Sequence, residues 1–276
     1  MPKVFLPLLL LLTLAMPAPG RSGELPLVDA HIHYSHDAWS VVPPKEAVAL
    51  LRRAGLKRAL VSSSNDEGTQ TLLAEAPDLV IPALRPYRTR GELATWVRDP
   101  SVIAYVEERL RAHRYVAIGE FHVYGADADL DVPRRIVELA KQHGLLLHVH
   151  GDAEAIDRLF RQDKDARILW AHAGFEPPER VREMLRRYRN LWADLATRSD
   201  HGAGGKVAPD WRPVFLELPD RFMVGTDTYV PERWHYVPEH ASWSRAWLAD
   251  LPPDVAERIA WKNGEAVLGG ALSNRR

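Results

Sequence analysis

Short, mostly apolar runs recur along the chain, separated by longer segments in which polar and apolar residues are mixed. A brief apolar run between polar segments is typical of a strand that is buried on both faces, as in a parallel sheet. Eight such runs predict eight strands, at residues 27–33, 58–64, 79–84, 115–123, 145–150, 166–172, 191–196 and 221–227.

Segments between several of these runs have helical boundaries, marked by proline at the start and, in most cases, glycine at the end. Helices are predicted on this basis at residues 45–54, 134–143, 179–188 and 254–268. Proline is favoured in the first turn of a helix and glycine just after the last turn. Strands that alternate with helices predict a parallel sheet covered by helices.

The length of the chain favours a closed barrel over an open sheet. The chain has 276 residues, and without its N-terminal segment it matches the ~250 residues typical of a (β/α)8 barrel. We therefore predict an α/β fold, a (β/α)8 TIM barrel in a single domain, over residues 21–276. The alternative is an open doubly wound sheet. No glycine-rich phosphate loop follows any of the runs, so its nucleotide functions are not expected.

Residues 1–20 have the pattern of an export signal. Lys3 precedes an apolar stretch that ends at about Met16, and a triplet of small residues, Ala18-Pro19-Gly20, follows it. The stretch is shorter than the ~20 residues that a membrane-spanning helix needs. We predict a cleaved signal peptide and a periplasmic or secreted protein that has no membrane attachment after cleavage. An uncleaved N-terminal anchor is the alternative.

Charge and cysteine content exclude several classes of function. Lys and Arg number 36 against 37 Asp and Glu, so the chain lacks the basic excess of a nucleic-acid-binding protein. It contains no cysteine, which excludes disulfides, thiolate metal sites and a cysteine nucleophile. The composition does not determine the oligomeric state and is compatible with a homo-oligomer. Chemistry is therefore expected from the 12 histidines and the carboxylates.

Histidines and carboxylates gather toward the carboxyl ends of the predicted strands, which is the face where barrel enzymes carry their active sites. Side chains two residues apart on a strand share a face, so two histidines of the first strand can point into the barrel together. Imidazole and carboxylate ligands suit divalent ions. We expect zinc, with manganese or iron as alternatives. Residues of these types at the strand ends are His31, His33, Glu120, His148, His150, His172 and Asp227.

The ordered set of strand motifs resembles the amidohydrolase superfamily of metal-dependent hydrolases. The motifs are VDAHIH, IGE, HVHGD, WAHAG and VGTD. They are similar to the amidohydrolase-related branch, which also contains decarboxylases. The resemblance implies that His31, His33 and Asp227 bind the more buried metal. It also implies that Asp227 takes a proton from the attacking water.

The same resemblance leaves open how many ions are bound. His150 and His172 match histidines that bind a second metal. In one-metal members, one of the two binds the ion and the other acts as a catalyst. Glu120 matches the glutamate that bridges two metals; the alternative is that it only hydrogen-bonds a ligand. We favour two ions, because Glu120 and Asp227 offset two dications better than one.

Other polar residues receive structural or substrate roles. We predict that His148 is a buried, hydrogen-bonded histidine beneath the site and that Asp152 caps a helix. Arg85, His122 and Arg198 are the candidate substrate contacts, with Arg198 in a cation-bearing loop that could hold a carboxylate or phosphate. The aromatic residues after the last strand form either a wall of the site or core packing.

These observations predict a metal-dependent hydrolase that acts on a small molecule. Metal-activated water would attack an amide, ester, lactone or phosphoester, with Asp227 and His172 as catalytic residues. One alternative is a nonoxidative decarboxylase with a single metal. Another is a noncatalytic binding protein that keeps the barrel, which the complete ligand set disfavours because unused buried polar groups cost stability.

Overall fold

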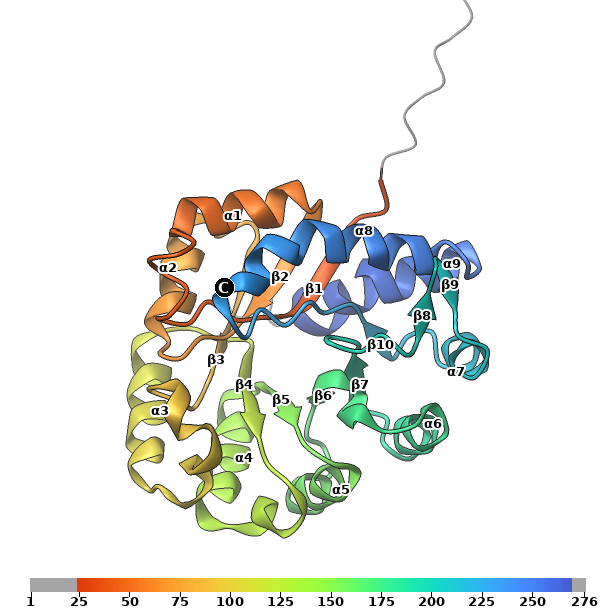
Figure 1. Cartoon of the computed structure of the whole chain (residues 1–276). Helices are drawn as coiled ribbons and strands as arrows, with labels where there is room; N and C mark the ends of the chain where they lie inside the picture. Colours follow the sequence, from red (N-terminus) through yellow and green to blue (C-terminus); the bar gives the residue numbers. More distant parts are fainter. Residues whose placement is uncertain (1–23, 270–276) are drawn as a thin grey trace, which may run out of the picture.

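The computed structural model of the chain describes residues 24–269, so the predicted signal peptide lies outside the described residues. Eight parallel strands run through the middle of the molecule (Figure 1). All eight predicted strands are confirmed, with ends that differ by a few residues. They are β1 Leu27–Ile32, β2 Leu56–Val61, β3 Val80–Leu84, β4 Ala117–His122, β5 Leu146–His150, β6 Ile168–Trp170, β7 Leu191–Asp194 and β10 Phe222–Met223.

The strands form a nearly closed barrel. Each strand pairs with the next along the chain, in the order β1 to β7 and then β10. The backbone N–H of Ala30 in β1 donates to Val224 O, directly after β10, at 2.8 Å. This bond joins the two ends of the sheet, which confirms the TIM barrel and excludes the open doubly wound alternative. Residues of the barrel interior form a small core of their own, including Val28, Leu60, Leu146, Leu169 and Met223.

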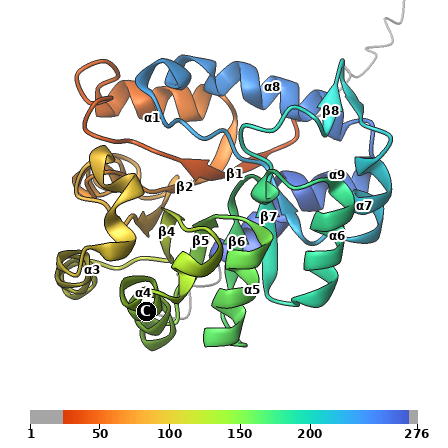
Figure 2. The same ribbon diagram turned by 60° about the horizontal axis from the view of Figure 1, so that its bottom comes forward.

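Helices surround the strands in both views (Figures 1 and 2). They are α1 Pro44–Arg53, α2 Glu67–Glu75, α3 Ser101–Ala112, α4 Asp131–His143, α5 Ala153–Gln162, α6 Pro178–Arg187, α7 Trp211–Glu217, α8 Val237–Leu248 and α9 Pro253–Glu257. The larger core lies between these helices and the outer faces of the strands. No helix within residues 24–269 has both the length and the apolar character needed to cross a membrane.

The last predicted helix, at residues 254–268, is more irregular than expected. Its first turn is α9, and two π-helical segments follow, Arg258–Lys262 and Glu265–Gly269. Between them, the side-chain amide of Asn263 donates to the carbonyl oxygens of Pro219 and Phe222, at 2.9 and 2.8 Å. The segment is therefore fixed against the start of β10 by a buried side chain as well as by packing.

The segment after β7 also differs from expectation. In place of an irregular loop, it forms a short antiparallel hairpin of β8 Gly202–Ala203 and β9 Lys206–Val207, packed against α8. Arg198 at its start is buried, because its guanidinium is ion-paired with Asp200 and donates to His172 O at 3.2 Å.

His201, next to this hairpin, lies in a box of aromatic rings. Its ring centroid is 4.8 Å from that of Trp247 and 5.2 Å from that of Trp243. The side chain is 1% exposed. Among the described residues, neither ring nitrogen has a hydrogen-bond partner. Burial therefore favours the neutral imidazole and lowers the pKa of His201 to about 3.

This burial predicts a measurable acid sensitivity. In the unfolded chain His201 takes up a proton below about pH 6.5, whereas in the folded chain it stays neutral down to about pH 3. The unfolding free energy should therefore fall by about 1.4 kcal/mol per pH unit as pH drops through this window. The unfolding free energy can be measured by urea unfolding at pH 7.5 and at pH 5. Between these two pH values it should fall by about 2 kcal/mol less in His201→Leu than in the unsubstituted protein. Equal losses in the two proteins would contradict this account of His201.

Candidate metal centre and active site

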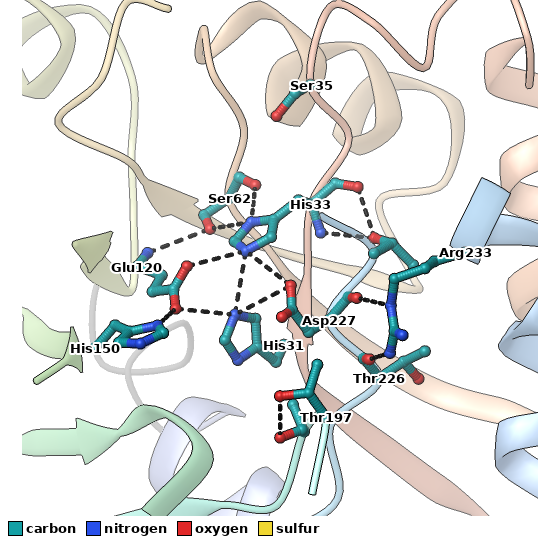
Figure 3. A network of polar contacts seen from close by, with 12 residues as sticks. His31, His33, Ser35, Ser62, Glu120, His150, Thr197, Thr226, Asp227 and Arg233 are labelled. Atoms are coloured by element: carbon teal, nitrogen blue, oxygen red, sulfur yellow. Dashed lines mark hydrogen bonds and ion pairs between the residues drawn. The ribbon is translucent and has the colours of Figure 1, made fainter. Parts of the chain in front are cut away.

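The two histidines of the first strand meet the carboxylate that follows the last strand. His31 and His33 both point into the mouth of the barrel, and their Nε2 atoms lie 3.1 Å apart (Figure 3). Asp227 Oδ1 lies 3.7 Å from His31 Nε2 and 3.3 Å from His33 Nε2. The geometry therefore joins these three side chains into one set of potential metal ligands.

Glu120 from β4 joins this set to a second one. Its Oε1 atom lies 2.9 Å from His150 Nδ1 and 3.4 Å from His172 Nε2. Its Oε2 atom lies 3.2 Å from His33 Nε2. The structure therefore brings together all six predicted ligands, which we call the histidine–carboxylate cluster.

Contacts behind the cluster fix how three of its rings are oriented. The Nδ1 atoms of His33 and His172 face backbone carbonyl oxygens of Ser62 and Ala196, each at 2.8 Å. His31 Nδ1 faces Asp194 Oδ2 at 3.2 Å. Because carbonyl oxygens only accept, the proton of a neutral ring is placed on Nδ1. The Nε2 lone pairs then point into the cluster, as in histidines that bind a metal.

The cluster fits a bound cation. With the protons on Nδ1, inward Nε2 acceptors face carboxylate oxygens, which are also acceptors. Among the described residues, Asp227 Oδ1 is buried and has no hydrogen-bond partner. A positive ion between these atoms would satisfy both kinds of acceptor.

The electrostatics of the buried groups agree with this fit. Burial acts to lower the pKa of His31, but the carboxylates of Asp194, Glu120 and Asp227 raise it well above its usual value. Burial acts to raise the pKa of Glu120, but the charge of His31 and the hydrogen bonds from His150 and His172 help to hold it well below its usual value. The cluster thus stabilises positive charge within it strongly.

Asp194, at the end of β7, is a functional candidate that the sequence analysis missed. It is fully buried and accepts hydrogen bonds from the backbone N–H groups of His172 and Ala196, each at 3.0 Å. Its Oδ2 atom also contacts His148 Nε2 at 2.9 Å. This contact confirms the prediction that His148 is a buried, hydrogen-bonded histidine. The available signal was a carboxylate within the predicted buried strand at residues 191–196.

Asp29 was also missed, although it precedes His31 by two residues on the same strand. It is buried and accepts hydrogen bonds from Thr226 N–H at 3.1 Å and from the Thr226 hydroxyl. Burial raises the pKa of Asp29 to about 6. The contacts tie the first strand to the turn that carries Asp227.

Asp152, as predicted, caps α5 by accepting from Ala155 N–H at 2.7 Å.

Three strand ends hold residues in the left-handed backbone region. His172, Thr197 and Asp227 have φ values of 56°, 55° and 58°. A non-glycine residue in this region costs on the order of 1 kcal/mol and is typical of functional sites. Each follows one of the last three strands of the barrel, so strained backbone surrounds one side of the cluster.

A cavity of about 480 Å³ opens above the cluster, and we call it the first cavity. Of the predicted substrate contacts, Arg85 and His122 line it, together with Arg90. The Arg85 guanidinium donates to Glu120 Oε2 at 2.8 Å. Burial lowers the pKa of His122 to about 3. Arg198 does not line the first cavity; it lines a separate one beside it.

Comparison with known families agrees with this geometry. A family model described as amidohydrolase matches residues 28–270. The chain belongs to the amidohydrolase family. It is therefore an enzyme of this family, as the resemblance in the sequence implied. A search of curated proteins found no match.

Solved structures of low sequence identity share the fold of this amidohydrolase. An uncharacterised TIM-barrel protein from Bordetella bronchiseptica is 16% identical, with 90% of this chain and 100% of that chain covered and a TM-score of 0.64. A protein from Acinetobacter baumannii, described as a probable 2-pyrone-4,6-dicarboxylic acid hydrolase with citric acid bound, is 11% identical. That match covers 88% of this chain and 99% of the other, with a TM-score of 0.62. Molinate hydrolase is 15% identical over 88% and 73% of the two chains, with a TM-score of 0.57.

The contacts of Asp194 predict a positioning role toward the metal ligands. Asp194→Asn keeps the shape of the side chain but replaces one carboxylate oxygen with an amide NH2. If the NH2 takes the place of Oδ2, it meets the ring N–H groups of His31 and His148, which then lose their acceptor. If it takes the place of Oδ1, the backbone N–H groups of His172 and Ala196 lose theirs. Metal affinity should fall about 10- to 100-fold, as for other residues that orient ligands. Competition for zinc against a chelator measures this.

The control for this substitution is Asp163→Asn. Asp163 is also a buried carboxylate and accepts from Lys141 at 3.2 Å, but it precedes β6 and lies at the opposite end of the barrel. It should keep the metal affinity of the unsubstituted protein. Unchanged affinity in Asp194→Asn would rule out the positioning role.

Proposed function

We propose that this amidohydrolase is a metal-dependent hydrolase that uses water to cleave an amide, ester, lactone or phosphoester bond of a small molecule. The observation that carries the proposal is the cluster itself, in which six donor side chains converge and four of them, Glu120, His150, His172 and Asp227, line the first cavity. The chemistry of these donors suits zinc, with manganese or iron as alternatives.

The cluster offers two sets of three donors for divalent ions. One set is His31, His33 and Asp227, and the other is Glu120, His150 and His172. When bound, a divalent ion supplies Lewis-acid chemistry, because it polarises the substrate oxygen and lowers the pKa of water in the site. These sets are compatible with one or two ions per chain. The negative charges of Glu120 and Asp227 favour two, because they offset two dications better than one.

Asp227 is the residue that we assign as general base. Its carboxylate lines the first cavity, and no donor among the described residues occupies its Oδ1 atom. It is therefore placed to take a proton from the attacking water. His172 Nε2 lies 4.0 Å from Asp227 Oδ2 in the same wall. In a site with one ion, His172 is placed to hold or pass on a proton beside Asp227.

The first cavity is large enough for a small-molecule substrate. Arg85 and His122 reach it from β3 and β4, so we keep both as proposed substrate contacts. His122 Nδ1 lies 3.1 Å from the Tyr87 hydroxyl, which fixes the ring. Arg198 faces the neighbouring cavity, and we do not retain it as a substrate contact.

A nonoxidative decarboxylase with a single ion is the second candidate function. One contact favours it: Arg85 donates to Glu120 Oε2, so that oxygen is already occupied by a buried cation. Arg85 thus offsets part of the carboxylate charge that a second ion would draw on. This contact therefore favours one ion, which is the form that the resemblance implied for the decarboxylases.

We further propose that residues 1–20 direct export, and that the mature enzyme acts in the periplasm or outside the cell. The support is the sequence pattern alone, a lysine followed by an apolar stretch and a triplet of small residues.

Metal content tests the cluster directly. Elemental mass spectrometry of the mature protein, purified without chelator, should find about two ions per chain if both sets of donors are filled. Glu120→Gln should lower this content toward one ion, because it removes the charge of the second set. Glu75→Gln is the matched control, since Glu75 is exposed at the end of α2, and it should keep the full content.

Other results would redirect the proposal. About one ion, unaffected by Glu120→Gln, would favour the one-metal decarboxylase. Absence of metal even after reconstitution with zinc or manganese would refute the metal centre.

Once a substrate has been found by screening, isotope transfer distinguishes the two reactions. In water enriched in oxygen-18, a hydrolase adds one solvent oxygen to the product, whereas a decarboxylase releases carbon dioxide. Asp227→Asn should lower kcat about 10²- to 10⁴-fold, because it removes the general base. A variant that kept full activity would show that Asp227 is not the base.

A further inference from the structure

A second cavity of about 340 Å³ lies beside the first, with Thr197 in the lining of both. Its other lining residues come from the segment after β7, the turn after β10, the 3-10 helix Pro231–Tyr236 and α8. Those that matter here are Arg198, Arg233, Tyr236, Glu239, His240 and Trp243. None of the six residues of the histidine–carboxylate cluster lines it, so it is a separate space.

Arg233 gives this cavity an unneutralised positive charge. Its Nε and Nη2 atoms donate to the carbonyl oxygens of Asp227 and Thr226, at 2.6 and 2.7 Å. Within residues 24–269, no carboxylate forms an ion pair with it. Arg198, by contrast, is ion-paired with Asp200. A guanidinium that lines a cavity without a counter-ion is suited to bind an anion.

Aromatic surface lies next to this charge. Trp243 and Tyr236 line the cavity, and Tyr236 is 59% exposed. The His240 ring centroid lies 5.3 Å from that of Trp243. Burial, followed by the charge of Arg233, lowers the pKa of His240 to about 4, so the ring is neutral at pH 7. The cavity therefore combines an arginine that has no carboxylate partner among the described residues with aromatic walls.

We propose that the second cavity binds an aromatic carboxylate, with its carboxylate on Arg233 and its ring against Trp243. Carboxylates match the planar donor face of a guanidinium, and aromatic rings pack on one another with additional gain beyond buried area. Among the described residues, Glu239 is the one carboxylate that lines this cavity. Its side chain is exposed and repels an anionic ligand only through solvent.

A ligand in the second cavity would lie against the arginines that hold the main chain of the proposed metal site. Figure 3 shows Arg233 on the far side of Asp227 from His31 and His33. Arg198 likewise donates to the carbonyl oxygen of His172. The two arginines thus hold the main chain of two cluster residues that have left-handed backbones. An anion on Arg233 would share the guanidinium with the Asp227 carbonyl without entering the first cavity.

Binding of 2-naphthoate to the metal-loaded protein tests the proposal, with uncharged 2-naphthylmethanol as the matched ligand. Isothermal titration calorimetry should detect 2-naphthoate and give a Kd about tenfold higher, or more, for 2-naphthylmethanol. Arg233→Gln should raise the Kd of 2-naphthoate about tenfold, since it removes the charge. Glu239→Gln should lower this Kd about twofold, because it removes an exposed like charge.

Further variants separate the two cavities. Arg90→Gln changes an arginine of the first cavity and should leave the Kd unchanged. Trp243→Leu removes the aromatic wall without touching the hydrogen bonds of Arg233, and it should weaken binding even if Arg233→Gln does not fold. The proposal is overturned if no heat is measured at millimolar 2-naphthoate. It is also overturned if Arg90→Gln weakens binding while Arg233→Gln and Trp243→Leu do not. Neither result would alter the metal content on which the proposed function rests.

Discussion

The buried carboxylate of Asp194 is the constraint on which the site depends. An ionised carboxylate without solvent is costly unless several donors surround it. Here the donors come from four strands: the rings of His31 on β1 and His148 on β5, and the backbone N–H groups of His172 after β6 and Ala196 after β7. Satisfying one side chain therefore fixes the relative height of four strand ends. Burial acts to raise the pKa of Asp194, but His31 and His148 hold it well below its usual value, so the group stays charged and keeps its partners.

The strained backbone at the mouth of the barrel is stabilised by residues outside the histidine–carboxylate cluster. The left-handed residues His172 and Asp227 direct their side chains inward, and their carbonyl oxygens then accept from Arg198 and Arg233. Asp29 holds the preceding turn through Thr226. The conformations that aim the ligands are thus stabilised by hydrogen bonds behind them, in the way that metal ligands depend on the groups that orient them. The same arginines line the second cavity, which places that cavity against the supporting layer of the site.

Much of this architecture could be predicted from the sequence because it depends on periodicity. Buried parallel strands give apolar runs, and side chains at their ends share a face, so the strands and the gathering of histidines and carboxylates followed from position along the chain. The choice of the six cluster residues among them came from the family resemblance. Asp194 followed from neither, because its role comes from partners on three other strands that no local pattern shows. The burial of Arg198 also depends on Asp200 and on a hairpin two residues further on. Contacts of this kind are set by tertiary packing and leave no trace in the local spacing of polar residues.

The charge around Glu120 explains why the two sets of ligands are not equivalent. His31, His33 and Asp227 converge with no arginine within the set, and Asp227 Oδ1 has no donor of its own among the described residues. Glu120 instead faces two ways: Oε1 toward His150 and His172, and Oε2 toward His33 and the Arg85 guanidinium. The arginine already neutralises part of the charge that a second ion would use. We therefore propose that the first set is the stronger cation site of the two, because the second shares its carboxylate with Arg85.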